Sequence, residues 1–265
     1  MAIVISSINL KGGVGKTTLA KYLGMTYAIR GKRILIIDLC QNSGVITRFG
    51  YNRYGLKYDS RDFISGLVPF ENIVVHDEET GIDILPGSNM VDKIQSDAES
   101  QRAFGYEWKI KESLESIKDR YDYIIFDTHP TETNRIVIMT MIASDYVLIP
   151  CVLDKESVNQ TERTHTLLQQ LKEQKIKVDY KVVMMAVDYS RGMQLPLDKV
   201  CELFESLGIP LTNTKIRYST TIMKESLEEI MDEKKPKKSS YYYQNVMEDF
   251  GKLADEVESE LAVKG

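Results

Sequence analysis

The chain has 265 residues, of which 43% are hydrophobic and 28% charged, and this balance excludes an intrinsically disordered or fibrous protein. Its formal net charge of −5 gives no overall attraction to nucleic acid or anionic lipid, so a contact with either must come from a local patch. Cys40, Cys151 and Cys201 lack the C-x-x-C spacing of redox and metal motifs, and no apolar stretch approaches the roughly 20 residues that span a membrane. We therefore expect a cytoplasmic protein without a signal peptide, a membrane span or a disulfide framework.

The first predicted elements are a strand, a glycine-rich loop and a helix. Residues 2–8 form an apolar run that predicts a buried strand, and residues 19–24 are typical of a helix. Between them lies Lys-Gly-Gly-Val-Gly-Lys-Thr-Thr, residues 11–18. Glycines let the backbone turn so that successive N–H groups point at one anion, and the helix N-terminus adds its dipole. The expected phosphate-binding residues are Gly12, Gly13, Val14, Gly15, Lys16, Thr17 and Thr18.

This loop predicts a site for ATP and Mg²⁺. Lys16 is expected to reach the β- and γ-phosphates and the Thr17 hydroxyl to bind Mg²⁺, as in other P-loops. A glycine-rich turn that binds nothing is the simpler alternative. The order of strand, loop and helix favours the phosphate site, because the motif requires that context.

Strands and helices then alternate along the chain. Residues 33–39 and 121–127 predict two buried strands, and each places an aspartate, Asp38 or Asp127, at its carboxyl end. Further strands are expected at residues 82–88, 146–150, 180–187 and 213–216, and helices at about 89–99, 108–118, 157–171 and near 195. We predict an α/β fold with a single doubly wound, mostly parallel sheet of about seven strands flanked by helices, forming one P-loop ATPase domain over residues 1–265. Since ligands gather at the carboxyl ends of parallel strands, both aspartates and the loop should meet in one crevice.

The last predicted helix begins at Tyr241. Its apolar residues recur at helical spacing on one face, at Val246, Phe250, Leu253, Val257 and Leu261. The opposite face is acidic, with Glu248, Asp249, Asp255, Glu256, Glu258 and Glu260. A helix that lies on a membrane surface carries Lys and Arg on its polar face. We therefore expect this helix to pack on its own domain, and we expect no stable membrane association.

The phosphate loop departs from the common G-x-x-x-x-G-K-[ST] pattern, because Leu10 stands where the pattern has glycine and Lys11 follows it. With this early lysine the chain resembles the deviant-Walker ATPases of the ParA/MinD superfamily. Residues 143–150, Ala-Ser-Asp-Tyr-Val-Leu-Ile-Pro, resemble a second segment of that family. The resemblance implies that Lys11 reaches across a dimer interface to the partner subunit's nucleotide. It assigns catalysis to Lys11, Lys16 and Asp38, and the Mg²⁺ site to Thr17, Asp38 and the Walker-B aspartate, Asp127.

The chain departs from this family at Cys40. The family's second motif reads D-x-D-P-Q-G-N, whereas residues 38–44 read Asp-Leu-Cys-Gln-Asn-Ser-Gly. Cys40 therefore stands where the family has the aspartate that orients the attacking water. A neutral thiol cannot accept a proton from water as a carboxylate does, so we expect slow hydrolysis, with ATP binding and dimerisation retained. Gln41 and Asn42 are alternative groups that could orient the water.

The resemblance implies a DNA-segregation ATPase of the ParA/Soj type. In such a protein ATP closes a homodimer, the dimer binds non-specific DNA on the nucleoid, and a centromere-binding ParB-type protein stimulates hydrolysis. Candidate DNA contacts are Arg191, Lys215 and Arg217, and the lysines within residues 234–238 could add phosphate contacts. Ordinary surface cations are the alternative interpretation of all these residues.

Other functions stay open. A MinD-like positioning ATPase would share the loop and bind a membrane. A non-hydrolysing ATP-dependent dimer switch would follow from Cys40. A bacterial tyrosine kinase shares the fold and ends in tyrosines such as Tyr241–Tyr243, but those kinases lack the early lysine found here as Lys11.

Overall fold

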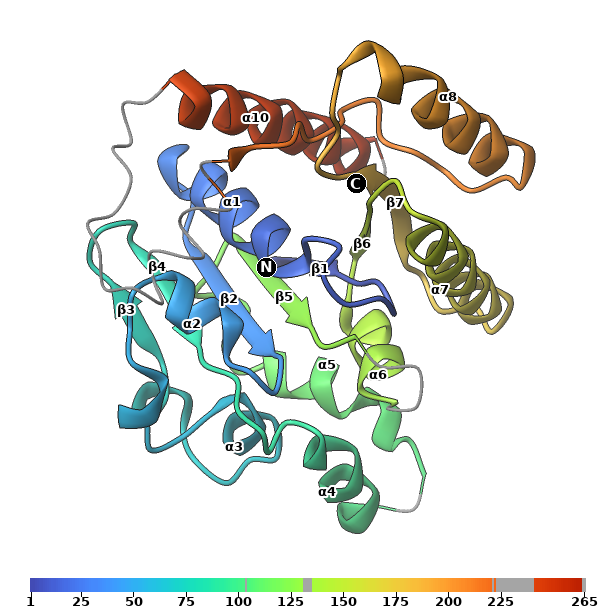
Figure 1. The fold of residues 1–265 in the computed structure, drawn as a ribbon. Helices are drawn as coiled ribbons and strands as arrows, with labels where there is room; N and C mark the ends of the chain where they lie inside the picture. Colours follow the sequence, from blue (N-terminus) through green and yellow to red (C-terminus); the bar gives the residue numbers. More distant parts are fainter. Residues whose placement is uncertain (103, 131–134, 221, 223–240, 264–265) are drawn as a thin grey trace.

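A central β-sheet runs through the molecule, and helices cover both of its faces (Figure 1). The computed structural model describes residues 1–265 except 103, 131–134, 221, 223–240 and 264–265. The strands are β1 (Ile3–Ser7), β2 (Ile34–Leu39), β3 (Val75–Asp77), β4 (Ile82–Leu85), β5 (Tyr123–Thr128), β6 (Tyr146–Cys151) and β7 (Asp179–Met184).

The strand order is β3-β4-β2-β5-β1-β6-β7, and every neighbouring pair is parallel except β3 with β4. This order confirms the predicted doubly wound, mostly parallel sheet of about seven strands. Strands β2, β5 and β1 lie next to one another at its centre. Because they are parallel, the segments that follow them leave the sheet at the same edge.

One predicted strand is wrong, and one strand was not predicted. Residues 213–216 form no strand, because the backbone amides of Asn213 and Thr214 donate to the Glu256 carboxylate at 2.9 and 3.1 Å. Isolated bridges, Val182 with Leu211 and Val187 with Arg217, flank this segment, and Ile216 also forms backbone hydrogen bonds with Met184 and Val187. The seventh strand is instead the antiparallel edge strand β3, whose three residues are too few to show an alternating pattern.

The helices form two layers around the sheet. One layer contains α1 (Lys16–Ile29), α2 (Gly44–Arg48) and α10 (Tyr241–Ala262). The other contains α3 (Ser60–Ile64), α4 (Lys93–Gln101), α5 (Lys109–Leu114), α6 (Ile136–Ala143), α7 (Lys155–Glu173) and α8 (Arg191–Ser206). Short 3₁₀ helices lie at Arg53–Gly55, Phe70–Asn72 and Tyr106–Trp108.

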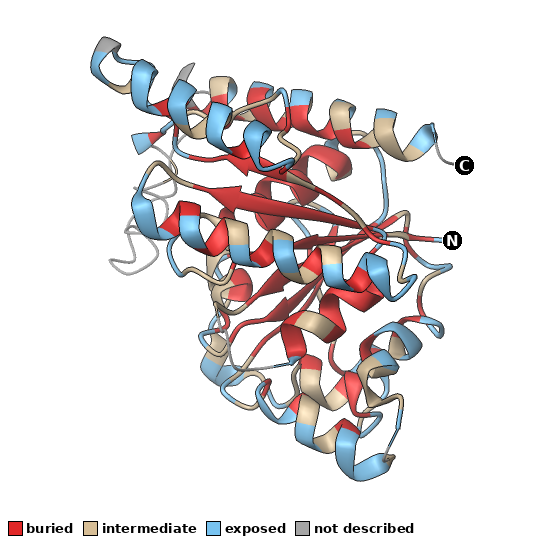
Figure 2. Cartoon of the chain, turned by 90° about the vertical axis from the view of Figure 1, so that its right-hand side faces the viewer, coloured by how far each residue is buried: buried red, intermediate tan, exposed pale blue. Residues whose placement is uncertain are grey.

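The apolar core is divided by the sheet into two sides. In β2, Ile34 and Ile36 face α1, whereas Leu35 and Ile37 face the opposite layer. Figure 2 shows the strands buried between helices whose outer surfaces are exposed. Both faces of a covered parallel sheet must be apolar, which explains why these strands are continuous hydrophobic runs.

Helix α10 packs along α1, as expected (Figure 1). Its residues Val246, Phe250, Leu253 and Val257 are buried. The acidic side of α10 is bound into the fold. Ion pairs and hydrogen bonds join Asp249 to Arg217, Glu256 and Glu260 to Lys181, Glu258 to Arg30 and Tyr123, and Glu260 to Tyr146. Among the described residues, no helix combines the length and the apolar character needed to cross a bilayer.

Candidate nucleotide site

The glycine-rich loop leaves β1 and enters α1 at the edge of the sheet where the parallel strands end. Gly13 and Gly15 have φ of 75° and 96°, a region that L-residues with a side chain rarely adopt. Gly15 is the residue before the first turn of α1, and it caps the helix without a side chain. The loop therefore brings backbone N–H groups to the positive end of the α1 dipole, as an anion site requires.

Lys16 is buried within this loop. Its Nζ donates to the carbonyl oxygens of Asn9 at 2.9 Å and of Lys11 at 2.6 Å. Burial lowers the pKa of Lys16 to about 8, although Asp127 and Cys40 act in the opposite direction. The ammonium is thus held beside the loop by two neutral carbonyls, which are weaker partners than a phosphate group.

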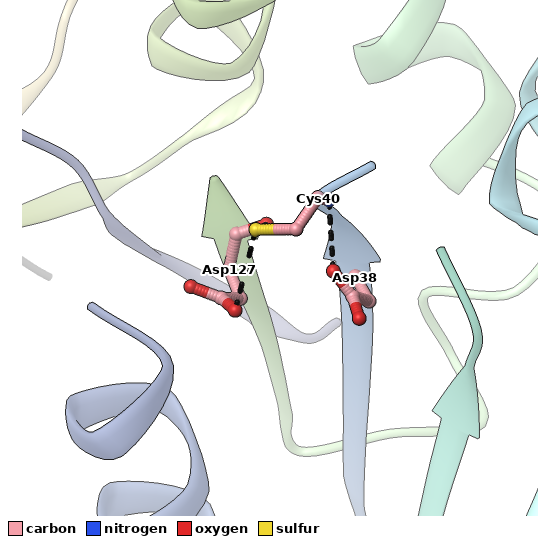
Figure 3. Close-up of side chains that lie close together, drawn as sticks. All are labelled: Asp38, Cys40 and Asp127. Atoms are coloured by element: carbon pink, nitrogen blue, oxygen red, sulfur yellow. Dashed lines mark hydrogen bonds between the residues drawn. The ribbon is translucent and has the colours of Figure 1, made fainter. Parts of the chain in front are cut away.

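Asp38 and Asp127 lie side by side at the ends of β2 and β5, where the two residues are register partners (Figure 3). Both are fully buried. The oxygens of Asp38 accept from the backbone amides of Cys40 at 2.8 Å and Val45 at 3.0 Å. Burial and the neighbouring charge of Asp127 raise the pKa of Asp38, and burial also raises the pKa of Asp127. The sequence predicted this convergence, and the structure confirms it.

Cys40 completes the cluster. Its Sγ lies 3.5 Å from Asp127 Oδ2, and one ligand atom from each of Asp38, Cys40 and Asp127 lies within 4.8 Å of the others (Figure 3). Burial, followed by the charges of Asp127 and Asp38, raises the pKa of the thiol well above its usual value. Cys40 is therefore a neutral thiol that donates toward Asp127, and it offers no base for a water molecule.

The residues of this edge suit a nucleotide with Mg²⁺. Asp127 Oδ1 is buried and has no hydrogen-bond partner among the described residues, while the neighbouring Thr17 hydroxyl acts to lower the pKa of the Asp127 carboxyl. A carboxylate oxygen and a hydroxyl are the hard oxygen ligands that Mg²⁺ prefers. The unpartnered oxygen is costly in a buried place unless a cation or water satisfies it. Loop, lysine and carboxylate thus fit the group that the sequence predicts.

Lys11 lies at the rim of this site. Its Nζ pairs with the Asp154 carboxylate of the same chain at 2.5 Å, and about a quarter of the Lys11 side chain is exposed. Asp154 also caps α7 by accepting from the backbone amide of Ser157 at 2.9 Å. In the single chain, the lysine that the family resemblance assigns to a partner's nucleotide is therefore held by its own subunit.

Sequence reasoning missed the residues that hold the Asp38–Cys40 turn. A Cβ on Gly87 would lie 2.5 Å from the Cys40 carbonyl oxygen and 2.9 Å from Asp38 Cγ. Ser60 Oγ donates to the Asp38 carbonyl oxygen at 2.7 Å, and Ser43 Oγ donates to the Gly87 carbonyl oxygen. The sequence signal for this close approach of two backbones is Gly87 itself, which lies two residues beyond the end of β4.

The predicted DNA contacts lie in two segments that the fold brings together. Arg191 is the first residue of α8, and the bridge between Val187 and Arg217 places the loop before it beside Lys215 and Arg217. Lys215 is half-buried. Arg217 forms an ion pair within the chain. Its Nε and Nη2 donate to the buried Asp249 carboxylate at 2.7 and 2.6 Å. The lysines within residues 234–238 lie outside the described residues.

Comparison with known proteins shows the family to which this chain is similar. Residues 2–184 match a protein family described as an AAA domain. An uncharacterized protein of Methanocaldococcus jannaschii is 28% identical over 220 residues, which cover 78% of this chain and 82% of that protein. The sporulation initiation inhibitor protein Soj of Bacillus subtilis is 29% identical over 150 residues, which cover 57% of this chain and 58% of Soj. The chain thus spans a little over half the length of Soj.

Solved structures share the fold over nearly the whole chain. Cobyrinic acid a,c-diamide synthase from Mycobacterium smegmatis, with bound ADP and magnesium, has a TM-score of 0.81 at 18% identity and covers 100% of this chain and 97% of its own. A variant of Cyanothece McdA in complex with ATP has a TM-score of 0.80 at 19% identity and covers 97% of this chain and 96% of its own. At such identities the likeness shows the fold alone.

Proposed function

The chain belongs to the AAA-domain family, and from this premise we propose that it is an ATP-dependent DNA partition ATPase of the ParA/Soj type. The observation that carries the proposal is the convergence of the glycine loop, Lys16 and Asp127, with its unpartnered oxygen, on one edge of the sheet. The early lysine, Lys11, supports the ParA/MinD type of ATPase over the bacterial tyrosine kinases.

The proposed substrate is ATP with Mg²⁺. When bound, Mg²⁺ neutralises phosphate charge and favours transfer of the terminal phosphoryl group to water. Thr17 and Asp127 would hold the ion, and Asp38 would keep the turn beyond β2 in place through the amides of Cys40 and Val45. Lys16 would exchange its two loop carbonyls for phosphate oxygens, which are stronger partners for an ammonium.

The proposed cycle includes an ATP-dependent homodimer. Lys11 would leave Asp154 to reach the nucleotide of the second subunit, and the partial exposure of their ion pair makes this exchange inexpensive in free energy. The dimer would bind non-specific DNA on the nucleoid, and a ParB-type partner would stimulate hydrolysis and release.

The proposed DNA surface includes Arg191, Lys215 and Arg217. The bridge between Val187 and Arg217 brings the segment with Lys215 and Arg217 next to the loop that leads to Arg191, and this supports one patch. Arg217 already neutralises Asp249, so Lys215 is the better test of direct phosphate contact. The apolar face of α10 packs on α1, which argues against a MinD-like use of this helix at a membrane.

A gel-shift experiment with non-specific duplex DNA tests the function. We expect binding with ATP, weak binding with ADP or without nucleotide, and a decrease as salt is raised. Lys215→Gln should weaken binding and lower the salt slope by about one, whereas Lys32→Gln, an exposed lysine before β2, should leave both unchanged. Binding that ignores nucleotide, or binding to lipid vesicles in place of DNA, would contradict the proposal.

A second candidate, a dimer switch that does not hydrolyse ATP, is favoured by Cys40. The neutral thiol occupies the place of a water-orienting carboxylate beside Asp127. Cys40→Asp should raise phosphate release about tenfold or more in saturating Mg²⁺ and ATP, because a carboxylate can accept the proton of the water. Cys40→Ser is the matched control and should stay slow. A Cys40→Asp variant no faster than wild type would show that Cys40 does not limit hydrolysis.

Cys40→Asp should also make the nucleotide-free protein less stable, because a third carboxyl group would join Asp38 and Asp127 in a buried cluster. Added Mg²⁺ and nucleotide should restore the melting temperature. This second measurement separates a misfolded variant from a folded one that hydrolyses slowly.

A further inference from the structure

Arg48 ends α2 and lies against the first turn of α1. Its Nη1 donates to the Thr18 hydroxyl at 2.8 Å, and Thr18 is the last residue of the glycine loop. The Arg48 side chain is half-buried, and Thr18 is buried. The guanidinium therefore lies beside the phosphate loop, although Arg48 follows the loop by 30 residues in sequence.

Within the part of the chain that the structure describes, no ion pair neutralises the charge of Arg48. The structure pairs Arg30, Arg61 and Arg217 with carboxylates, but Arg48 has no carboxylate at ion-pair distance among the described residues. Its partner Thr18 lies in the first turn of α1, so the guanidinium is close to the positive end of this helix. Positive groups gathered at a helix N-terminus repel one another unless an anion joins them.

The backbone around Arg48 is fixed. Lys21 Nζ donates to the Arg48 carbonyl oxygen at 2.6 Å, and the next residue, Phe49, is buried in the core. Lys21 Nζ also lies 5.5 Å from the centroid of the Phe49 ring. A guanidinium held in this way loses little conformational freedom when it binds, so it is preorganised for its ligand.

We infer that Arg48 is a ligand of the α- and β-phosphates of the bound nucleotide, held ready by the Thr18 hydroxyl. This inference rests on the proposed ATP site. There Lys16 and Thr17 take the β/γ end and Mg²⁺, while the amides of the glycine loop surround the α- and β-phosphates. Arg48 is tied to Thr18 at the end of that loop, and a guanidinium matches phosphate oxygens in charge and in geometry.

Equilibrium binding of ADP and ATP in the presence of Mg²⁺ tests the inference. Arg48→Met should weaken both nucleotides about 10- to 100-fold and to the same extent, because the α- and β-phosphates are common to them. Arg48→Lys should recover part of the loss. Arg53→Met is the matched control, since Arg53 is the next arginine along the chain and its guanidinium donates to Asn42 and Tyr54 instead of the phosphate loop. This variant should bind nucleotide as wild type does.

A phosphorothioate distinguishes a direct contact from a structural role. ADP with sulfur in place of a non-bridging α-phosphate oxygen should bind wild type more weakly than ADP, and Arg48→Met should largely lose this discrimination. Wild-type affinity in Arg48→Met, or an unchanged sulfur effect, would overturn the inference while the nucleotide site stands. A wild-type protein that binds neither ADP nor ATP would overturn the proposed function, and this assignment with it.

Discussion

Lys16 is a single residue through which the phosphate loop lowers the stability of the folded state. Its ammonium is buried, its direct partners are two backbone carbonyls, and its pKa falls to about 8 from an ordinary value of 10.5. A buried cation whose pKa is lowered destabilises the folded state wherever it stays charged. The site is thus arranged for a ligand at some expense of stability, as functional sites often are.

We predict that Lys16→Met is more stable than wild type at pH 7 without nucleotide, by on the order of 2 kcal/mol. Between about pH 8 and pH 10.5 the unfolded chain binds more protons than the folded one, so wild-type stability should rise with pH relative to the variant. The difference should vanish above that window. Urea unfolding across this pH range measures it.

Lys32→Met, which changes an exposed lysine, is the control and should show no such pH dependence relative to wild type. A Lys16→Met variant that is less stable than wild type at pH 7 would contradict the argument from burial.

Gly87 supports the site because the backbone of Cys40 and Asp38 lies too close to it for any side chain. Gly87→Ala should cost about 1–3 kcal/mol, because the new Cβ would meet backbone of Cys40 and Asp38 that cannot move without shifting the site. We expect weaker binding of Mg²⁺-nucleotide as well, measured by calorimetry. Gly192→Ala on α8 meets nothing within 4 Å, and because alanine is the better helix former this control should not destabilise the fold. If the two variants have equal stability and equal affinity for nucleotide, Gly87 does not support the site.

At the scale of elements, α10 ties the two ends of the fold together. Its carboxylates bind residues at the start of β5 and β6, at the end of α1 and in the segment after β7. The contacts of α10 therefore depend on the correct placement of both the sheet and α1. An acidic helix face looks solvated in sequence, but here several of its charges are neutralised by partners from distant segments.

We predict that Arg217→Ala lowers the free energy of unfolding by about 2 kcal/mol or more, because it leaves the buried Asp249 carboxylate unpaired. Arg217→Met with Asp249→Leu should recover most of that loss, since no unpaired charge remains. Thermal unfolding of the single and double variants measures this. If Arg217→Ala leaves the free energy of unfolding unchanged, water satisfies the Asp249 carboxylate. Arg217 would then again be a candidate for direct DNA contact.

At the scale of the whole molecule, the phosphate loop lies at an open edge of the sheet with Lys11 at its rim. The proposed function requires this edge to meet a second copy of the chain. The net charge of −5 opposes non-specific association, so the interface must form through specific contacts.

We predict that wild type dimerises with Mg²⁺ and ATP in sedimentation velocity, and that Lys11→Ala stays monomeric. Asp154→Asn should dimerise at about two- to fivefold lower protein concentration, because it releases Lys11 from a partly exposed ion pair while an asparagine still caps α7. If Lys11→Ala dimerises as wild type does, Lys11 has no role across the interface.

The sequence by itself determined the parallel strands, the loop and the convergence of Asp38 with Asp127, but not the antiparallel edge strand β3. These follow from local patterns, since hydrophobic runs, glycine spacing and the rules of parallel sheets need no knowledge of distant contacts. Only the tertiary structure decided which residues contact one another around the site and on the surface. The pairing of Lys11 with Asp154, of Arg217 with Asp249, of Gly87 with the Cys40 turn and of Arg48 with Thr18 joins residues that are far apart in the chain. Whether a charge on the surface is available to a ligand or already neutralised depends on such contacts, and no local pattern encodes them.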